Sequence, residues 1–462
     1  MDLLMELLDA PQQAQDTTAE PANTSAAATA EDTRPALRFI TCGSVDDGKS
    51  TLIGRLLLDS RSVLQDQLAS VSRSGAVDLA QFTDGLSAER EQGITIDVAY
   101  RYFSTARRKF IIGDAPGHEQ YTRNMVTAAS SADAAVVLVD ATKLPWHGDT
   151  APSREHHQLL PQTRRHSLLA RMLRVPSIVF AVNKLDAVAD APLAFANIRQ
   201  ALESFARAAD IPLAGIVPIS ALHGNNVAHA DALWCGYRGP GLLELLEQLP
   251  ATSTETTVAP AFPVQWVEKL ADDNTAASAG NGHRVFWGRV ATGRLAAGQR
   301  VAVMPGGQVA TVTRVLDHAR RPVDQMSAGR SAGLVLDRQV DVSRGDWLLA
   351  HDDRSEPFAS RREVVATVAW LDDEPLQVGR TYWAVHGHRW VKARVTRIGH
   401  QLDVHTLERH GAEQLGTNTI GEVELALQAP IAVLPYGVSR ALGALVLVDV
   451  ASHKTAGAAL LH

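Results

Sequence analysis

One octapeptide near the start of the chain constrains its fold more than any other feature. Residues 43–50 read GSVDDGKS, which matches the pattern GxxxxGK[ST]. An apolar run precedes it at residues 37–42, and leucines at helical spacing follow it. Between a strand and a helix, such glycines let backbone N–H groups wrap a phosphate chain, and the helix N-terminus adds its dipole. A chance match inside a loop is the alternative, and the context argues against it.

Short apolar runs alternate with longer amphipathic segments from residue 36 to about residue 250. Helical spacing is clear in the segment that contains Leu193, Ile198 and Leu202. This alternation predicts a doubly wound, mainly parallel sheet with helices on both faces. The runs expected to form its strands are residues 37–42, 110–112, 134–140, 178–182 and 216–219.

The pattern changes after residues 251–261, a Thr-, Ala- and Pro-containing stretch typical of a linker. Beyond it, short β-branched segments separated by turns predict two all-β barrels, at residues 262–352 and 361–462. With an α/β P-loop domain at residues 35–250, this makes three domains, as 462 residues suggest at ~150 residues per domain. The expected β-strands include residues 262–267, 284–290, 299–304, 309–316, 331–336, 363–370, 390–398 and 420–427.

The first 34 residues differ from the rest in composition. They are rich in Ala, Thr, Gln and acids, so we expect a disordered extension, with a docking helix at residues 1–8 as the alternative. Acids at the start argue against a secretory signal or a mitochondrial presequence. A net charge of −7 makes broad attraction to nucleic acid or an anionic membrane unlikely, and no apolar run approaches ~20 residues. Two widely separated cysteines predict a reducing, cytoplasmic compartment.

A second motif supplies a carboxylate for a metal ion. The apolar run before residue 114 ends at Asp114, and Gly117 follows shortly after. In P-loop nucleotide hydrolases an acid at this position meets Mg²⁺ together with the P-loop hydroxyl, here Ser50, while Lys49 reaches the β- and γ-phosphates. Gly117 lacks a side chain, so its N–H can approach the γ-phosphate. A lone Asp after a strand is more often a helix N-cap, but the order of motifs favours the metal role.

Two further motifs indicate which base is bound. Asn183, Lys184 and Asp186 form an NKxD motif after an apolar run, and its last carboxylate would accept two hydrogen bonds from guanine N1 and N2. Adenine has no such donors, so it would leave the carboxylate unpaired. Residues 220–222 (SAL) would present the Ala221 N–H to guanine O6. NKxD alone is weak because its residues are common in turns, but four motifs in this order favour GTP over ATP.

With these motifs the chain resembles the translational GTPase superfamily, whose members join a GTP-binding domain to two β-barrels. Residues 89–97 (EREQGITID) are similar to its first switch and residues 114–118 (DAPGH) to its second. The resemblance implies that Thr95 ligates magnesium and senses the γ-phosphate, and that His118 orients the attacking water. It also implies that Val45 and Ile94 are the apolar pair that flanks this histidine. Asp46 matches an acid that helps to bind a monovalent cation.

Within the superfamily the match is narrower. Elongation factors typically carry His at the position of Asp47 and Thr at that of Ser50, whereas VDDGKS, DGLSAEREQGITIDVAYRYFST and GHEQYTRNMVTAAS are similar to the GTPase subunits of bacterial sulfate adenylyltransferase. This resemblance implies a small partner subunit that makes adenylylsulfate and pyrophosphate from ATP and sulfate, driven by GTP hydrolysis here. A single GK pair and the lack of an SGGxDS loop fit that division, and predict that the adenylylsulfate kinase domain of some relatives is absent.

The residues expected to act fall into three overlapping sets. The catalytic set is His118, Thr95 and Lys49, and the magnesium ligands are Ser50, Thr95 and Asp114. Ala115 replaces the Thr usual in the family's DTPG, with little expected chemical effect. The nucleotide-binding set is Gly43, Ser44, Val45, Asp46, Asp47, Gly48, Lys49, Ser50, Thr51, Asp114, Ala115, Pro116, Gly117, His118, Asn183, Lys184, Asp186, Ser220, Ala221 and Leu222.

Other features leave alternatives open. The stretch at residues 143–162 is longer and richer in His and Pro than in the family, and we expect a loop that extends to Thr163. A metal site there, at His147, His156, His157 and His166, lacks completing ligands. Trp370, Trp383 and Trp390 could stack on RNA, but strand aromatics usually pack in a core or interface. The arginine pairs at residues 164–165 and 361–362 are by default solvated, and a structural role is the alternative for the first pair, whose context TRRHS is shared with the family. The competing functions are an aminoacyl-tRNA-binding translation factor and a regulatory GTP-binding scaffold.

Overall fold

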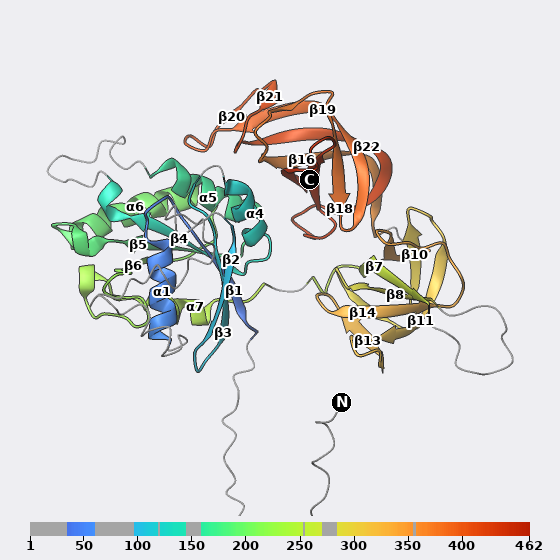
Figure 1. Ribbon diagram of the computed structural model, residues 1–462, viewed down its shortest axis with the longest axis horizontal. Coiled ribbons are helices and arrows are strands. Elements are labelled where there is room, and N and C mark those ends of the chain that lie inside the picture. Colours follow the sequence, from blue (N-terminus) through green and yellow to red (C-terminus); the bar gives the residue numbers. More distant parts are fainter. Residues whose placement is uncertain are drawn as a thin grey trace, which may run out of the picture. The chain divides into compact units, whose positions relative to one another are not determined.

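The computed structural model describes residues 35–60, 97–118, 121–144, 159–252, 255–269, 284–353 and 357–462 (Figure 1). The expected N-terminal extension, nearly all of the expected first switch and most of the stretch at residues 143–162 lie outside these residues. Pro35–His462 form one unit by their contacts.

The α/β part of the chain is built on one six-stranded sheet. Parallel strands from β1, β3, β4, β5 and β6 confirm the predicted sheet, and β2 adds an antiparallel edge. The prediction missed β2 because its sequence, AYRYFS, is not an apolar run: five of its six residues are exposed or half-buried, and only Phe103 is buried. In sheet order the strands are β2 (Ala99–Ser104), β3 (Lys109–Asp114), β1 (Leu37–Cys42), β4 (Ala134–Asp140), β5 (Ser177–Asn183) and β6 (Leu213–Pro218).

Helices cover both faces of this sheet, which confirms the doubly wound fold (Figure 1). Successive residues of β4 enter different cores: Val136 and Leu138 pack with α1 and α7, whereas Val137 and Val139 pack with α4, α5 and α6. This is the two-residue period of a strand buried on both sides. The helices are α1 (Lys49–Asp59), α4 (Thr122–Ala129), α5 (Pro161–Met172), α6 (Ala191–Ala208) and α7 (Leu242–Gln248), with short 3-10 turns η3 (Ala141–Lys143), η4 (Leu185–Ala187) and η5 (Trp234–Gly236).

The start of α5 corrects one prediction. The loop expected to reach Thr163 ends earlier, since Pro161 is the first residue of the helix. A proline fits the first helical position because its fixed φ suits the helix and its missing N–H has no partner there in any case. Pro161 therefore begins a helix instead of breaking one.

Two closed β-barrels follow, as predicted, while the exact domain boundaries stay a prediction. In each, one extra strand pairing, β10 with β11 or β18 with β19, closes the sheet on itself. The middle barrel comprises β7 (Ala261–Lys269), β8 (Arg284–Arg289), β10 (Arg300–Met304), β11 (Val309–Leu316), β14 (Ser331–Leu336) and β15 (Trp347–Ala350), with short strands β9 (Arg294–Ala296), β12 (Pro322–Val323) and β13 (Gln325–Ser327).

The last barrel comprises β16 (Ala359–Trp370), β18 (Thr381–His386), β19 (Arg389–Leu402), β22 (Ile420–Val433), β23 (Ala444–Asp449) and β24 (Thr455–Leu461), with β17 (Leu376–Gln377), β20 (Arg409–His410) and β21 (Gln414–Leu415). Strand β16 starts at Ala359, earlier than the expected residue 363. Core packing is confirmed for Trp370, which is fully buried with its ring edge-to-face on Tyr382. Trp390 is 52% exposed and so does not pack in the core, and for it only packing in an interface stays a prediction.

Hydrogen bonds connect the α/β part to the last barrel. Arg164 Nε donates to the Val404 carbonyl at 2.9 Å, and Tyr436 Oη donates to the Leu173 carbonyl at 3.1 Å. Of the two roles left open for Arg164, the structure favours the structural one, because the guanidinium donates to carbonyls in the loop between β19 and β20. Among the helices that the structure describes, none is long and apolar enough to cross a bilayer.

Candidate nucleotide-binding site

The P-loop lies between β1 and α1, where its two glycines are sterically required. Gly43 and Gly48 have φ of 150° and 92°, on the side that favours glycine. A Cβ at Gly43 would lie 2.8 Å from the Leu138 carbonyl oxygen, and one at Gly48 would lie 2.5 Å from Asn183 Nδ2. The loop is thus packed directly on β4 and on the NKxD motif, so any side chain at either glycine would push it away from them.

Side chains fix the beginning of the P-loop. Asp47 Oδ2 accepts the Ser44 N–H at 2.6 Å, and Lys49 Nζ donates to the Ser44 carbonyl at 2.7 Å. The Gly43 N–H donates to Nδ1 of His166, a fully buried residue of α5, at 3.1 Å. The loop therefore takes its shape from its own residues and from a helix more than a hundred residues away in sequence.

His166 has a role that the sequence did not reveal. Because Nδ1 accepts a hydrogen bond from the Gly43 N–H, the neutral ring carries its proton on Nε2. Burial, helped by the positive charges of Lys49 and Arg165, lowers the pKa of His166 to about 3. The ring is thus a neutral acceptor for the P-loop. The other three histidines of the weighed metal site lie outside the described residues.

The expected magnesium carboxylate and the expected second switch meet the P-loop. Asp114 ends β3, is almost fully buried and accepts the Thr41 hydroxyl at 3.0 Å. A Cβ at Gly117 would lie 2.5 Å from Lys49 Nζ and 3.0 Å from the Ser44 carbonyl oxygen. Burial lowers the pKa of Lys49, while the negative charges of Asp114 and Asp47 raise it. A cation, a carboxylate and a glycine backbone thus converge on one end of the loop.

These residues fit a magnesium ion in their chemistry. Ser50 lies in the first turn of α1 and Asp114 is the last residue of β3. Their hydroxyl and carboxylate oxygens are hard ligands of the kind that Mg²⁺ prefers. Thr95, the third expected ligand, lies outside the described residues, as does Ile94. His118 is half-buried, with its ring edge-to-face to Tyr121 at 6.3 Å. Ala115, which replaces the usual Thr, is fully buried, and its N–H donates to the Thr41 carbonyl at 3.1 Å.

The NKxD and SAL motifs meet at the other end of the P-loop. Asn183 Nδ2 donates to the Asp47 carbonyl at 2.8 Å, and Asn183 Oδ1 accepts the Ala221 N–H at 3.0 Å. The N–H expected to meet guanine O6 is therefore directed at Asn183 in this structure. Asp186 lies at the surface, with its carboxylate 3.6 Å from His223 Nε2. Arg55 of α1 anchors the SAL loop through the carbonyls of its last two residues.

Two charged residues at and just after the end of β4 take part in the ion pairs around the P-loop, and sequence analysis missed both. Asp140 is buried and forms an ion pair with Lys184 at 2.7 Å, while Lys143 forms one with Asp47 at 3.0 Å. Burial would raise the pKa of Asp140, but Lys184 and the bonds from Thr142 hold it below its usual value. Their sequence, VDATK, carries no phosphate-binding motif. The only signal for their place near the P-loop is that they follow a strand predicted to lie in the same sheet as the P-loop strand.

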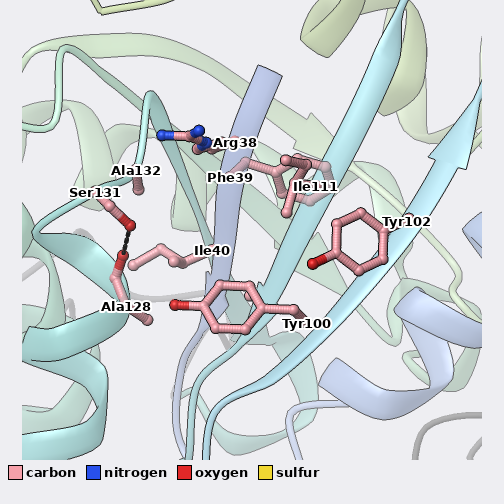
Figure 2. A pocket seen from close by; sticks show the side chains of 10 residues that line it. Arg38, Phe39, Ile40, Tyr100, Tyr102, Ile111, Ala128, Ser131 and Ala132 are labelled. Atoms are coloured by element: carbon pink, nitrogen blue, oxygen red, sulfur yellow. Dashed lines mark hydrogen bonds between the residues drawn. The ribbon is translucent and has the colours of Figure 1, made fainter. Parts of the chain in front are cut away.

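A hollow of about 240 Å³ lies elsewhere, between β1, β2, β3 and the end of α4 (Figure 2). Figure 2 shows Tyr100 and Tyr102 side by side on β2, facing Ile40 and Ser131 across it. None of residues 43–50 lines it, so it is separate from the nucleotide motifs.

Comparison with known families matches two parts of the chain. The Elongation factor Tu GTP binding domain matches residues 34–255, and the GTP-eEF1A C-terminal domain-like family matches residues 363–462. The first match spans all four nucleotide motifs, so the α/β part is a GTP-binding domain of that family. The second covers the last barrel.

Curated relatives match over almost the whole chain. "Sulfate adenylyltransferase subunit 1" of Laribacter hongkongensis is 43% identical over 93% of this chain and 86% of its own length. The same-named protein of Citrobacter koseri is 42% identical over 92% of the chain and 86% of its own length. The "Bifunctional enzyme CysN/CysC" of Xylella fastidiosa is 44% identical, and the match covers 93% of this chain and 66% of that protein. A crystal structure of sup35 with GDP is 21% identical over 93% of this chain and 94% of that one, with a TM-score of 0.39, too low to add to the fold described above.

Proposed function

Because the chain belongs to the family of sulfate adenylyltransferase subunit 1, we propose that it is the GTPase subunit of a two-subunit sulfate adenylyltransferase. GTP hydrolysis here would drive the formation of adenylylsulfate and pyrophosphate from ATP and sulfate on a smaller partner subunit. The observation that carries the proposal is the direct bonding of the P-loop to the NKxD motif, within a chain 43% identical to such a subunit over nearly its full length.

The GTP site works through groups already on this chain. Lys49 and the P-loop N–H groups bind the triphosphate, and the Asp186 carboxylate selects guanine by accepting from N1 and N2. When bound, magnesium would neutralise charge between the β- and γ-phosphates, held by Ser50, Asp114 and Thr95. The His118 imidazole orients the water that attacks the γ-phosphate. A water held in line lowers the barrier mainly by fixing its geometry.

The site supports a division of labour between the two subunits. The chain holds one GK pair and no pyrophosphate loop of the SGGxDS type, so the ATP and sulfate sites belong on the partner. Making adenylylsulfate is strongly uphill, and hydrolysis of a second nucleotide supplies the missing free energy only if the two reactions are coupled. This chain therefore has to change its contact with the partner as GTP is hydrolysed.

Reconstitution tests the proposal. The purified chain, mixed with the small subunit from the same organism, ATP, sulfate, magnesium and GTP, should make adenylylsulfate faster than the small subunit alone. Lys49→Ala should remove the increase because the phosphates lose their cation. Lys109→Ala, an exposed lysine on β3, is the matched control and should keep it. No GTP-dependent increase, or tight GTP-dependent binding of aminoacyl-tRNA instead, would overturn the proposal.

A further inference from the structure

Three side chains from outside the P-loop donate hydrogen bonds to three consecutive backbone carbonyls of the loop. Asn183 Nδ2 donates to the Asp47 carbonyl at 2.8 Å, and Lys184 Nζ donates to the Asp46 carbonyl at 2.6 Å. The preceding carbonyl, that of Val45, accepts a hydrogen bond from Lys143 Nζ. The first two donors belong to the NKxD motif. The third comes from η3, directly after β4, and belongs to none of the nucleotide motifs.

Lys143 is fixed in place by acids on both sides. Its ammonium lies 3.0 Å from Asp47 Oδ1 and 3.8 Å from Asp140 Oδ2, and both carboxylates are fully buried. Asp47 Oδ2 is already used by the Ser44 N–H, so the two oxygens of one carboxylate hold the loop backbone and the lysine together. A buried carboxylate needs its cation because an unpaired buried charge is costly. The Lys143–Asp47 pair thus ties the strand β4 end to the P-loop.

The two ends of the P-loop face different parts of the nucleotide. On the Gly48 side the loop touches Asn183 of the base motif. On the Ser44 side it touches Gly117 of the second switch, next to Lys49, which is the end for the γ-phosphate. Val45 follows Ser44 directly, so Lys143 holds the γ-phosphate end, while Asn183 and Lys184 hold the base end.

We propose that Lys143, anchored by Asp47, is a positioning residue for GTP hydrolysis that fixes the Val45 backbone beside the γ-phosphate. The inference rests on the proposed GTPase function and deepens it. With the carbonyls of residues 45–47 held outward, the loop N–H groups stay turned toward the phosphates. Loss of Lys143 removes the donor to the Val45 carbonyl and the cation beside Asp47, whereas the carbonyls of Asp46 and Asp47 at the base end keep their two donors.

The test separates hydrolysis from nucleotide retention. Lys143→Met keeps the length of the side chain and removes the donor, and Lys109→Met on the exposed end of β3 is its control. In the full chain, single-turnover GTP hydrolysis should slow about tenfold, which is the loss of one charged hydrogen bond. GDP dissociation, followed with a fluorescent GDP, should change less than about threefold. Equal losses in both, or unchanged hydrolysis, would overturn the proposal.

A second variant protects the test against misfolding. Lys143→Met leaves Asp47 buried without its cation, whereas the double change Lys143→Met with Asp47→Asn removes both charges. The double variant should regain thermal stability but still hydrolyse GTP slowly, because the Val45 carbonyl still lacks its donor. Recovery of hydrolysis together with stability would show a merely structural role. Failure of the unaltered chain to bind GTP would instead contradict the proposed function itself.

Discussion

At the scale of single residues, a change at His118 should affect the rate of GTP hydrolysis but hardly the affinity for GTP. In the proposed site its ring orients water and makes no contact with the phosphates. His118→Ala should therefore slow single-turnover GTP hydrolysis by about 100-fold or more, while the Kd for GTP changes little. Rapid-quench hydrolysis and equilibrium binding measure the two quantities. His229→Ala, whose side chain is 89% exposed, is the control, and an unchanged hydrolysis rate in His118→Ala would contradict the assignment.

Asp186 should decide which base is accepted. In the proposed site its carboxylate accepts from guanine N1 and N2, and Asp186→Asn would turn one oxygen into a donor that suits the additional carbonyl of xanthine. The ratio of GTP to xanthosine triphosphate affinity should fall by about 100-fold or more. Competitive binding of the two nucleotides measures this ratio. Guanine selectivity equal to that of the unaltered chain would refute the contact.

Two buried histidines predict how stability depends on pH. Burial lowers the pKa of His166 to about 3 and that of His386 to about 4, both below the ordinary value of about 6.5. Well above pH 6.5, neither the folded nor the unfolded chain holds a proton on these histidines. As the pH falls below 6.5, the unfolded chain binds protons that the folded chain excludes, so stability is lost toward pH 4 and below.

The expected loss is at most about 1.4 kcal/mol per pH unit for each histidine. Urea unfolding at pH 7.5, 6, 5 and 4.5 should show it, and His386→Gln should flatten the slope by one histidine's share. His386 touches Trp347 and the Leu442 carbonyl, away from the nucleotide site, so GTP binding serves as a check on folding. Stability that is constant over this range would contradict the assignment.

At the scale of elements, the approach of the second switch to the P-loop makes Gly117 critical. A Cβ there would crowd Lys49 Nζ and the Ser44 carbonyl, so Gly117→Ala should push the switch away from the γ-phosphate end. The preference for GTP over GDP should fall by about tenfold, with GDP affinity nearly unchanged, as titration with both nucleotides would show. Gly411→Ala, where a Cβ meets open space, is the control. An unaltered GTP preference would contradict this account.

Elements were predictable where one local rule decides them. Strand β4 is an unbroken apolar run, and α1 follows a phosphate motif, so both were predicted. Strand β2 was missed because an edge strand buries little, and α5 begins at a proline that local reasoning takes for a breaker. The NKxD motif and Lys49 are recognisable because their spacing is local. His166 and Lys143 were not assigned, since their P-loop partners lie 123 and 98 residues away and only the fold brings them together.

At the scale of the whole molecule, the proposed function requires the GTP-binding part to transmit its state. Pro35–His462 form one unit, in which Arg164 and Tyr436 tie α5 and the residues after it to the last barrel. Helix α5 also carries His166, which holds Gly43 of the P-loop. One helix thus touches both the nucleotide loop and the barrel. The two-barrel architecture was predictable from strand patterning, whereas this connection was not, because the sequence around Arg164 does not show which distant carbonyls the fold brings to it.

Coupling between GTP hydrolysis and adenylyl transfer is the central claim, and a plateau measures it most directly. The complex with its small subunit is given ATP, sulfate and added pyrophosphate until adenylylsulfate stops accumulating, and GTP is then added. A coupled GTPase predicts that adenylylsulfate rises well above the GTP-free plateau, with phosphate released from GTP in fixed proportion. Lys49→Ala should stay at the plateau. A faster approach to the same plateau, with no rise above it, would contradict the claim, because a catalyst alone cannot move an equilibrium.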